Sequence, residues 1–224
     1  MSRLLAISDI HGCFDTFHCL VTKHIGLTKS DRLILLGDYI DRGEKSKEVI
    51  DFIIDLMNTG FNITPLAGNH EAMFLDARRN PDMLPLWLLN DGMSTMQSFG
   101  IKNLNYIKKK YLDFFLKLNY YEKEGNFLFV HAGFNDLAPD PFSDKHGMIW
   151  ECRTFYDNPE LRTKTIIHGH RPKRPEFIEK LICEKSKVIP IDTGCVYQDV
   201  EGYGYLSALE VGTMKLISVE NKYV

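Results

Sequence analysis

The chain has 224 residues, of which 44% are hydrophobic and 25% are charged, an ordinary composition for a soluble globular protein. Its formal net charge of −3 provides no basic excess to neutralise nucleic-acid phosphates, so we expect no nucleic-acid partner. No apolar run approaches the roughly 20 residues of a membrane helix, so we expect no membrane partner either. The length predicts a single domain over residues 1–224.

The cysteines and the start of the chain indicate a cytoplasmic protein. The five cysteines are scattered and include no C-x-x-C pair, which predicts reduced thiols rather than a disulfide framework. From Met1 the chain runs directly into a strand-like segment, so we expect no signal peptide. Cys13 is either a small buried filler or a redox-sensitive thiol, and we prefer the filler.

The first third of the chain alternates predicted strands and helices. Short apolar runs predict buried strands at residues 4–8, 32–36 and 63–66. Helical character follows each of them, at residues 14–24, 45–58 and 71–79. This alternation implies βαβ units, in which ligands collect beyond the carboxyl ends of the strands.

The middle of the chain, residues 81–118, is predicted to be a helical insertion or cap. Its second part carries one apolar face, formed by Ile107, Tyr111, Phe114, Phe115 and Leu118. The segment could shape the substrate site or could simply pack into the core, and we favour packing.

The second half of the chain is rich in predicted strands. Its expected elements are a hairpin over 120–130, strands at 165–167 and 188–191, and a closing hairpin over 205–219. We therefore expect a second sheet packed on the first.

Polar segments follow the ends of five predicted strands. They are residues 9–12 (D-I-H-G), 37–43 (G-D-Y-I-D-R-G), 68–71 (G-N-H-E), 131–133 (H-A-G) and 168–170 (H-G-H). Together they supply carboxylates, imidazoles and a carboxamide, the ligand set for two borderline divalent metals that share a bridge. Metals beside a guanidinium, that of Arg42, favour phosphate esters as the substrate class.

The spacing of these residues suggests how the metals would be held. Asp9 and His11 can point at one ion, and Asp38 can offer one oxygen to that ion and the other to its neighbour. Asn69, His131 and a histidine of the last segment would complete the second site. Two ions about 3.5–4 Å apart acidify the water between them, and we expect the resulting hydroxide to attack phosphorus directly.

Three further residues have expected roles in catalysis. The planar guanidinium group of Arg42 can donate two parallel hydrogen bonds and so bind two phosphate oxygens. His70 can protonate the leaving oxygen, and Asp41 can hold its imidazole in the useful tautomer. Each residue alone has a plainer interpretation, such as a helix cap or a packed histidine, but five such segments in order at strand ends make that unconvincing.

The motifs D-x-H-G, G-D-x-x-D-R-G and G-N-H-E resemble the phosphoprotein phosphatase branch of the calcineurin-like metallophosphoesterases. Length and spacing are most similar to the small bacterial and bacteriophage-type serine/threonine protein phosphatases, over residues 4–211. The resemblance implies an α/β (α+β) fold with two mixed β-sheets in a sandwich flanked by helices. It also implies a dinuclear centre of manganese or iron, and zinc suits the same ligands. The implied ligands are Asp9, His11 and Asp38 for one ion and Asp38, Asn69, His131 and His170 for the other, with Asn69 also facing the phosphate.

The last motif and the surrounding sequence require choices. His170 stands in the family's Gly-His-x-Pro context, so we assign it as the ligand and His168 as a supporting or packing residue. Asp192 is expected to brace the site through backbone contacts. Ala67 replaces an arginine of the phage-type enzymes. Arg153 follows Trp150 at one residue more than in their Trp-x-Arg motif, and is either a second phosphate clamp or a charged residue at a helix start.

The sequence therefore predicts a metal-dependent phosphomonoesterase acting on phosphoserine or phosphothreonine in proteins. The closest alternative is a symmetrical diadenosine tetraphosphatase. Symmetrical diadenosine tetraphosphatases tend to have aspartate at the position of Glu71, so this glutamate weakly favours the protein phosphatase. A third hypothesis is a catalytically inactive scaffold that keeps the fold for binding.

Overall fold

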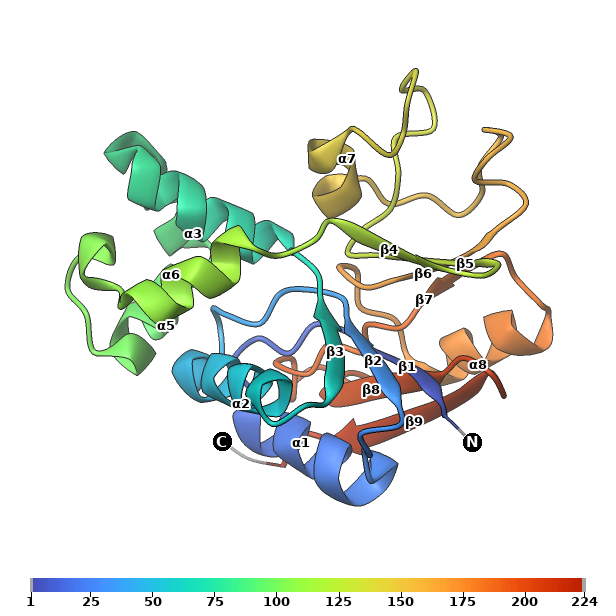
Figure 1. Ribbon diagram of the computed structural model, residues 1–224, viewed down its shortest axis with the longest axis horizontal. Coiled ribbons are helices and arrows are strands. Elements are labelled where there is room, and N and C mark those ends of the chain that lie inside the picture. The colour runs from blue at the N-terminus through green and yellow to red at the C-terminus, as the bar shows by residue number, and fades with distance from the viewer. Residues whose placement is uncertain (1, 223–224) are drawn as a thin grey trace.

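Two β-sheets lie face to face at the centre of the molecule (Figure 1). The structure, a computed structural model, describes residues 2–222. The first sheet has the order β3-β2-β1-β8-β9 and consists of β1 (Leu4–Ile7), β2 (Arg32–Leu35), β3 (Asn62–Pro65), β8 (Tyr205–Glu210) and β9 (Lys215–Glu220). The second has the order β4-β5-β6-β7 and consists of β4 (Tyr121–Glu124), β5 (Phe127–Val130), β6 (Thr165–His168) and β7 (Val188–Pro190). Both contain parallel and antiparallel pairs, so the predicted sandwich of two mixed sheets is confirmed.

Alternation along the strands builds the layers. In β1, Leu5 and Ile7 face one hydrophobic cluster while Ala6 faces another. In β5, Phe129 joins the cluster of Ala6, whereas Leu128 faces the opposite side. Because successive side chains of a strand point to opposite faces, one cluster fills the space between the sheets and the others lie under the covering helices.

Helices cover the outer faces and one side of the sandwich. On the first sheet these are α1 (Phe14–Cys19), a π-helical segment (Leu20–Ile25) and α2 (Ser46–Asn58). Helix α3 (Asn69–Arg79) packs instead against the helical segment 81–118 (Figure 1). On the second sheet α7 (Lys145–Trp150) contributes Met148 to the outer cluster. Helix α8 (Pro175–Cys183) contacts β7 and β9 and so closes one side (Figure 1).

The segment 81–118 is helical, as predicted. Its elements are a 3-10 turn (Pro81–Met83), α4 (Leu84–Leu89), α5 (Gly92–Phe99), a second 3-10 turn (Leu104–Tyr106) and α6 (Lys109–Leu116). All five residues of the predicted apolar face are buried in the cluster beneath the first sheet. The packing interpretation is therefore the one that the structure supports.

The predicted helix over 14–24 is confirmed: α1 continues at Leu20 as the π-helical segment, and Gly26 follows it in the left-handed conformation. One expectation about the elements was wrong. The closing hairpin joins the first sheet rather than the second, because β8 pairs with the free edge of β1. Pairing over such a sequence separation leaves no local signal in the chain.

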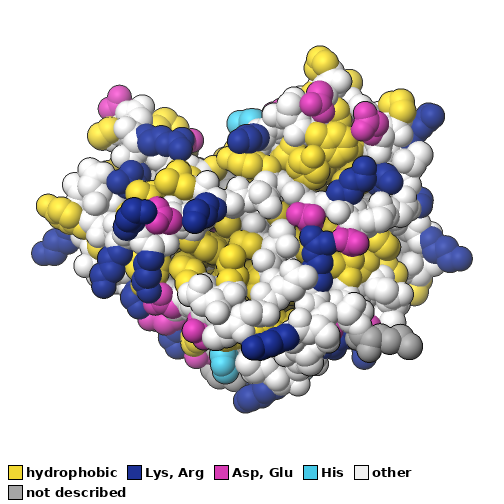
Figure 2. Space-filling view, viewed as in Figure 1, with side chains coloured by type: hydrophobic (Ala, Val, Ile, Leu, Met, Phe, Trp, Pro, Cys, Tyr) yellow, Lys and Arg dark blue, Asp and Glu magenta, His cyan; other side chains and the backbone are white. Residues whose placement is uncertain are grey.

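The surface carries charges of both signs. On the face shown in Figure 2, Lys and Arg side chains are interspersed with Asp and Glu, in keeping with the small net charge of −3.

Within residues 2–222, no helix combines the length and apolar character needed to cross a bilayer.

One buried ion pair should make stability depend on pH. Asp31, 2% exposed, accepts bonds from the Arg3 guanidinium at 2.7 and 3.1 Å and from the backbone N–H of Thr28 at 3.0 Å. The bond from Arg3 outweighs burial and holds the pKa of Asp31 well below its usual value. Because the folded-state pKa is depressed, the stabilisation is complete above about pH 4 and is lost as the pH falls below it.

We expect Asp31→Asn to lower the free energy of unfolding by about 1.5–3 kcal/mol at pH 7, the range for hydrogen bonds to charged groups. Urea titrations from pH 7 to pH 3 should show this difference shrinking toward acid. Asp76→Asn is the matched control, because Asp76 is exposed and lies 3.9 Å from Arg79. An unchanged midpoint for Asp31→Asn at pH 7 would contradict the argument.

Candidate active site

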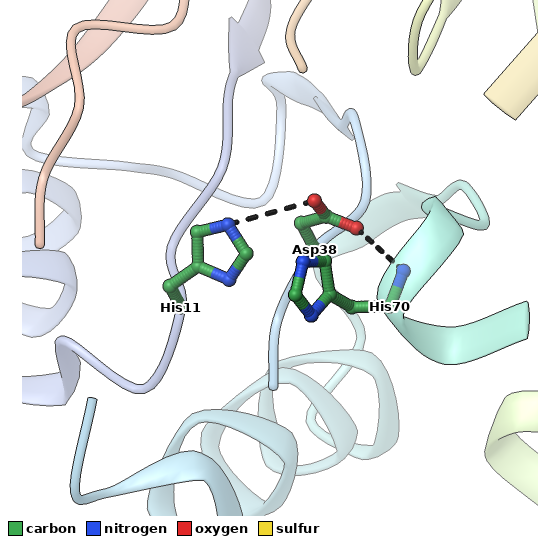
Figure 3. A group of neighbouring side chains, drawn as sticks. All are labelled: His11, Asp38 and His70. Carbon is green, nitrogen blue, oxygen red and sulfur yellow. Dashed lines mark hydrogen bonds and ion pairs between the residues drawn. The ribbon is translucent and has the colours of Figure 1, made fainter. Parts of the chain in front are cut away.

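All five predicted polar segments meet at one place, beyond the carboxyl ends of β1, β2 and β3 and beside those of β5 and β6. Two groups of side chains there could each hold a metal ion, and within each group the candidate ligand atoms lie within 4.8 Å of one another. They are His11, Asp38 and His70, and Asp38, His131 and His170. Figure 3 shows the first group, in which Asp38 faces the His11 ring and the backbone nitrogen of His70.

Asp38 occupies the centre of the site. Its Oδ2 atom lies 3.5 Å from Nε2 of His11 and 3.5 Å from Nε2 of His131. Its other oxygen, Oδ1, accepts the backbone N–H of His70 at 3.1 Å. The expectation was one oxygen for each ion, whereas in the structure a single oxygen faces both imidazoles and the second oxygen is engaged by the backbone.

The protonation of the two imidazoles follows from their partners. Nδ1 of His11 donates to the Ile40 carbonyl at 2.9 Å, and Nδ1 of His131 donates to the Leu36 carbonyl at 2.9 Å. A carbonyl only accepts, so in the neutral rings Nε2 carries the lone pair. Burial, followed by the charges of His70 and Arg42, keeps the pKa of His11 well below its usual value. This is the form in which histidine binds metals.

Asn69 lies beside the second group, and its side-chain oxygen converges with the ring nitrogens of His131 and His170. Oδ1 of Asn69 lies 2.9 Å from Nε2 of His131 and 3.0 Å from Nδ1 of His170. The two imidazole nitrogens are 3.1 Å apart. Neither the Asn69 oxygen nor Nε2 of His131 carries a proton, so two acceptors face each other, and a cation would satisfy them.

Buried carboxylates give the site an excess of negative charge. Asp9, Asp38, Glu71 and Asp192 are each at most 3% exposed. Burial, together with the charge of Asp9, raises the pKa of both Asp38 and Asp192 well above the usual range. Divalent cations would remove this repulsion, so the donor set fits two metal ions.

Asp9 lies next to these groups and is tied to the last motif. Both of its carboxylate oxygens lie 3.1 Å from the backbone nitrogen of His170, and Oδ1 accepts the Ser8 hydroxyl at 2.6 Å. It belongs to neither three-residue group; His70 lies beside His11 and Asp38 instead. A Cβ atom on Gly169 would lie 2.1 Å from Oδ1 of Asp9, so only glycine fits between the two histidines of the motif.

Strained backbone is concentrated at the site. Among the described residues, eight that are not glycine have positive φ, and five of them are His11, Asp38, Asp41, Arg42 and His170. Such conformations persist only where the surroundings enforce them, and they cluster at functional sites. Asp38, at φ 51°, approaches Gly68 so closely that a Cβ there would lie 2.1 Å from its carboxylate.

Glu71 holds two of the motifs together, a role that the sequence did not suggest. Its carboxylate accepts the backbone N–H groups of Gly68, Asp38 and Tyr39 at 3.0, 2.9 and 2.8 Å. Burial raises the pKa of Glu71, and the N–H bonds from Tyr39 and Gly68 oppose the shift. The residue is thus a clamp between the loops that follow β2 and β3.

His70 and Asp41 form the predicted pair. Nδ1 of His70 donates to Oδ2 of Asp41 at 2.7 Å, and both side chains are at most 1% exposed. Burial lowers the pKa of His70, but the charges of Asp38 and Asp41 outweigh it, so the pKa lies above its ordinary value. An imidazole in this environment keeps a proton near neutral pH, as an acid catalyst requires.

Two residues of the helical segment 81–118 brace Asp41 and were missed by the sequence analysis. The indole of Trp87 in α4 donates to Oδ2 at 2.8 Å, and the hydroxyl of Thr95 in α5 donates to Oδ1 at 2.6 Å. The Thr95 hydroxyl also accepts the backbone N–H of Asp41 at 2.8 Å. A Cβ on Gly92 would lie 2.4 Å from the Trp87 ring, so glycine lets the ring reach this position.

We expect Thr95→Val to lower the free energy of unfolding by about 1–3 kcal/mol, because the isosteric side chain leaves a buried carboxylate short of a donor. A loosened Asp41 should lower kcat by about tenfold, near 1.4 kcal/mol in the barrier, with KM nearly unchanged. Urea denaturation and steady-state kinetics measure both effects. Thr95→Ser keeps the hydroxyl and should behave like the parent protein; an equal loss in both variants would mean that the methyl group matters and the bond does not.

Arg42 faces the same space as the imidazoles. Its Nη1 donates to Nε2 of His11 at 2.8 Å, and its guanidinium carbon lies 5.6 Å from the centre of the Tyr197 ring. It also lines a cavity of about 170 Å³. A guanidinium beside candidate metal ligands and an open cavity is suited to binding a phosphate group.

The structure does not bring Arg153 into this cluster. Its guanidinium lies 3.6 Å from Glu151, and it lines a different cavity with Arg171 and Lys173. His168 lines that second cavity too, and its Nδ1 donates to the Gly169 carbonyl at 3.0 Å. Burial lowers the pKa of His168 to about 4.

The remaining residues singled out in the sequence have supporting contacts. Asp192 accepts the backbone N–H of Gly194 at 2.8 Å, a backbone brace of the expected kind. Ala67 is buried and donates its N–H to the Asn119 carbonyl at 2.7 Å. Cys13 is half-buried, and its thiol donates to the His11 carbonyl at 3.6 Å.

Comparison with known proteins gives concordant matches. Residues 2–191 match the family described as calcineurin-like phosphoesterases. The chain is 25% identical over 239 residues to the asymmetrical bis(5'-nucleosyl)-tetraphosphatase PrpE of Anoxybacillus flavithermus, covering 95% of this chain and 92% of that protein. A solved candidate diadenosine tetraphosphatase has a TM-score of 0.69 at 20% identity, covering 97% of this chain and 93% of its own. A protein serine/threonine phosphatase from Saccharomyces cerevisiae has a TM-score of 0.64 at 16% identity, covering 98% and 80%.

The two solved structures show a shared fold, since their sequence identities are low. The family match is the stronger finding because it spans most of the chain and includes the segments that converge at Asp38. The resemblance predicted from the motifs is confirmed: this protein belongs to the calcineurin-like phosphoesterase family.

Proposed function

We propose that this chain is a divalent-metal-dependent phosphohydrolase that cleaves dinucleoside polyphosphates. The observation that carries the hydrolase assignment is Oδ2 of Asp38, 3.5 Å from Nε2 of His11 and of His131. One carboxylate oxygen between two unprotonated imidazole nitrogens suits a residue that bridges two cations. The substrate class is supported by relatives named bis(5'-nucleosyl)-tetraphosphatase that align with most of the chain.

We assign the metal ligands as the motifs suggested. They are Asp9, His11 and Asp38 for one ion and Asp38, Asn69, His131 and His170 for the other. Manganese is our first choice, and iron or zinc would suit the same oxygen and imidazole donors. When bound, two such ions polarise phosphate oxygens and lower the pKa of the water between them.

The other side chains would orient the substrate and move its proton. Arg42 and the Asn69 amide would bind the non-bridging phosphate oxygens. His70 would protonate the leaving oxygen through Nε2, because its Nδ1–H is engaged by Asp41 at 2.7 Å. We propose that water attacks phosphorus directly; a phosphorylated side chain trapped by rapid quenching would contradict this step.

The second candidate is the phosphoserine or phosphothreonine phosphatase that the sequence favoured. Two observations support it. Glu71 completes the protein-phosphatase form of the third motif. The braced acid pair of His70 and Asp41 would be most useful for an alkoxide, which leaves poorly without a proton, and less so for a phosphate leaving group.

Steady-state rates on diadenosine tetraphosphate and on a phosphoserine peptide, at equal manganese, separate the candidates. We expect kcat/KM to be at least about tenfold higher on the dinucleotide, and anion-exchange chromatography to show a mononucleotide and a triphosphate. These unequal products are the ones expected of an asymmetrical tetraphosphatase, as the relatives are named. The alternative predicted from the sequence was a symmetrical diadenosine tetraphosphatase. Two diphosphates would restore the symmetrical alternative, and turnover of the peptide alone would overturn the substrate assignment. Absence of turnover on both, with metals bound, would favour a binding scaffold.

A further inference from the structure

We infer that a cavity beside the edge strand β7 is a second binding site, which takes a nucleotide. This cavity, here called the basic cavity, has a volume of about 230 Å³ and lies between α8, β7 and the loop 152–154. Its walls include Arg153, Arg171, Lys173, Phe177 and Leu181. The inference concerns binding and does not depend on the proposed cleavage reaction.

The charged wall of the basic cavity is positive throughout. Arg153, Arg171 and Lys173 line it, and none of its lining residues is acidic. Within the part of the chain that the structure describes, Arg171 and Lys173 form no ion pair with a carboxylate, while Arg153 lies 3.6 Å from Glu151. Arg171 and Lys173, two cations at one cavity without a paired carboxylate, attract an anion, and condensed phosphates present the most charge for their size.

Arg153 adds a specific unsatisfied donor. Its Nε atom is buried and has no hydrogen-bond partner among the described residues. A buried N–H without an acceptor is uncommon in folded proteins, since it forfeits the bond it would make to water. A phosphate oxygen in the cavity would meet the terminal nitrogens of Arg153, because the side chain is 31% exposed while Nε itself is buried.

Part of the cavity lining is apolar and includes an accessible aromatic ring. Leu181, Val188 and Pro190 belong to this part, and Phe177 is 46% exposed. Lys173 Nζ lies 6.0 Å from the centre of the Phe177 ring, so charge and aromatic surface lie side by side. A ligand with a phosphate group and a flat aromatic body would engage both, and nucleobases stack on such rings.

The volume limits what fits inside. Cavities that enclose a whole drug-sized ligand measure roughly 300–1,000 Å³, so about 230 Å³ holds only part of such a molecule. The cavity could hold one base while the phosphates lie outside it, or the phosphates while the base lies outside on the surface. We therefore infer a mononucleotide, or one end of a longer nucleotide, rather than an extended macromolecule.

Fluorescence titration of the metal-replete protein with mant-ADP tests the site. We expect Lys173→Glu to raise the Kd at least about tenfold, since it replaces an attraction to phosphate by a repulsion. Lys180→Glu is the matched control on α8, because Lys180 is 68% exposed and lies 3.8 Å from Glu184; its Kd should stay within about twofold of the parent. Photolabelling with 8-azido-ADP should modify the peptide that contains Phe177. Circular dichroism checks folding, and Lys173→Gln replaces Lys173→Glu if the latter unfolds.

The source of the phosphate is tested by competition. Tripolyphosphate should displace mant-ADP only at higher concentration than ADP does. Phe177→Ala should weaken mant-ADP binding but leave tripolyphosphate binding unchanged. If tripolyphosphate binds as tightly as ADP and Phe177→Ala changes neither, the cavity is an inorganic polyphosphate site and the inference is overturned.

The site of photolabelling by 8-azido-ADP distinguishes a failure of the second binding site from a failure of the proposed function. An active dinucleotide hydrolase whose photolabel lies only near Arg42, with mant-ADP binding indifferent to Lys173, would remove the second site and keep the function. A protein that cleaves no dinucleotide but binds mant-ADP through Lys173 would do the opposite.

Discussion

Substitution of His70 by asparagine should lower kcat by about 10²–10⁴-fold on a phosphate ester with a poor leaving group, the usual contribution of a positioned proton donor. The expectation rests on the bond of 2.7 Å from Nδ1 of His70 to Asp41, which fixes the ring and leaves Nε2 for the substrate. Asparagine keeps a polar side chain and the backbone N–H that donates to Asp38. Metal content should therefore stay near that of the parent protein.

Two esters that differ only in their leaving group make the test specific. The loss in kcat should be larger for phenyl phosphate than for p-nitrophenyl phosphate, because the nitrophenolate leaves more readily without a proton. His24 is exposed and lies outside every motif, so His24→Asn is the control. Equal losses on both esters would show that His70 does not donate the proton, and loss of bound metal would show that it is a ligand.

The sequence predicts the pair of Asp41 and His70 but not the side chains that hold Asp41 in place. Asp41 and His70 could be paired from their motifs, because both follow strands that neighbour each other in a sheet. Trp87 and Thr95 lie 46 and 54 residues from Asp41 and belong to a segment whose pattern reports only an apolar face. Their polar groups reach Asp41 through tertiary packing, which leaves no periodicity or spacing in the sequence.

The same distinction applies to Asp38 and the closing hairpin. That Asp38 would lie between the histidines of two motifs followed from strand order, but that one oxygen faces both imidazoles depends on a left-handed backbone and on the N–H of His70. Strands β8 and β9 were predicted correctly as elements. Their sheet was predicted wrongly, because the choice between two free edges is made by long-range packing.

Substitution of Asp38 by asparagine should have opposite effects on function and on stability. We expect activity to fall by more than about 10³-fold, since the proposed bridging oxygen is lost. We also expect the metal-free variant to be more stable than the metal-free parent by about 1–3 kcal/mol. Burial and the charges of Asp9 and Glu71 raise the pKa of Asp38, so a neutral amide relieves repulsion that the parent protein contains.

Asparagine also fits the position locally. It tolerates the left-handed conformation that Asp38 adopts at φ 51°, and its amide oxygen can still accept the N–H of His70. Thermal unfolding with and without manganese measures the effect. At a hundredfold excess over Kd, a ligand of the folded state stabilises it by about 2.7 kcal/mol, so the parent should respond to manganese and the variant should not. A variant that is less stable without metal, or that still responds to manganese, would show that the charge of Asp38 is compensated within the protein and is not kept for cations.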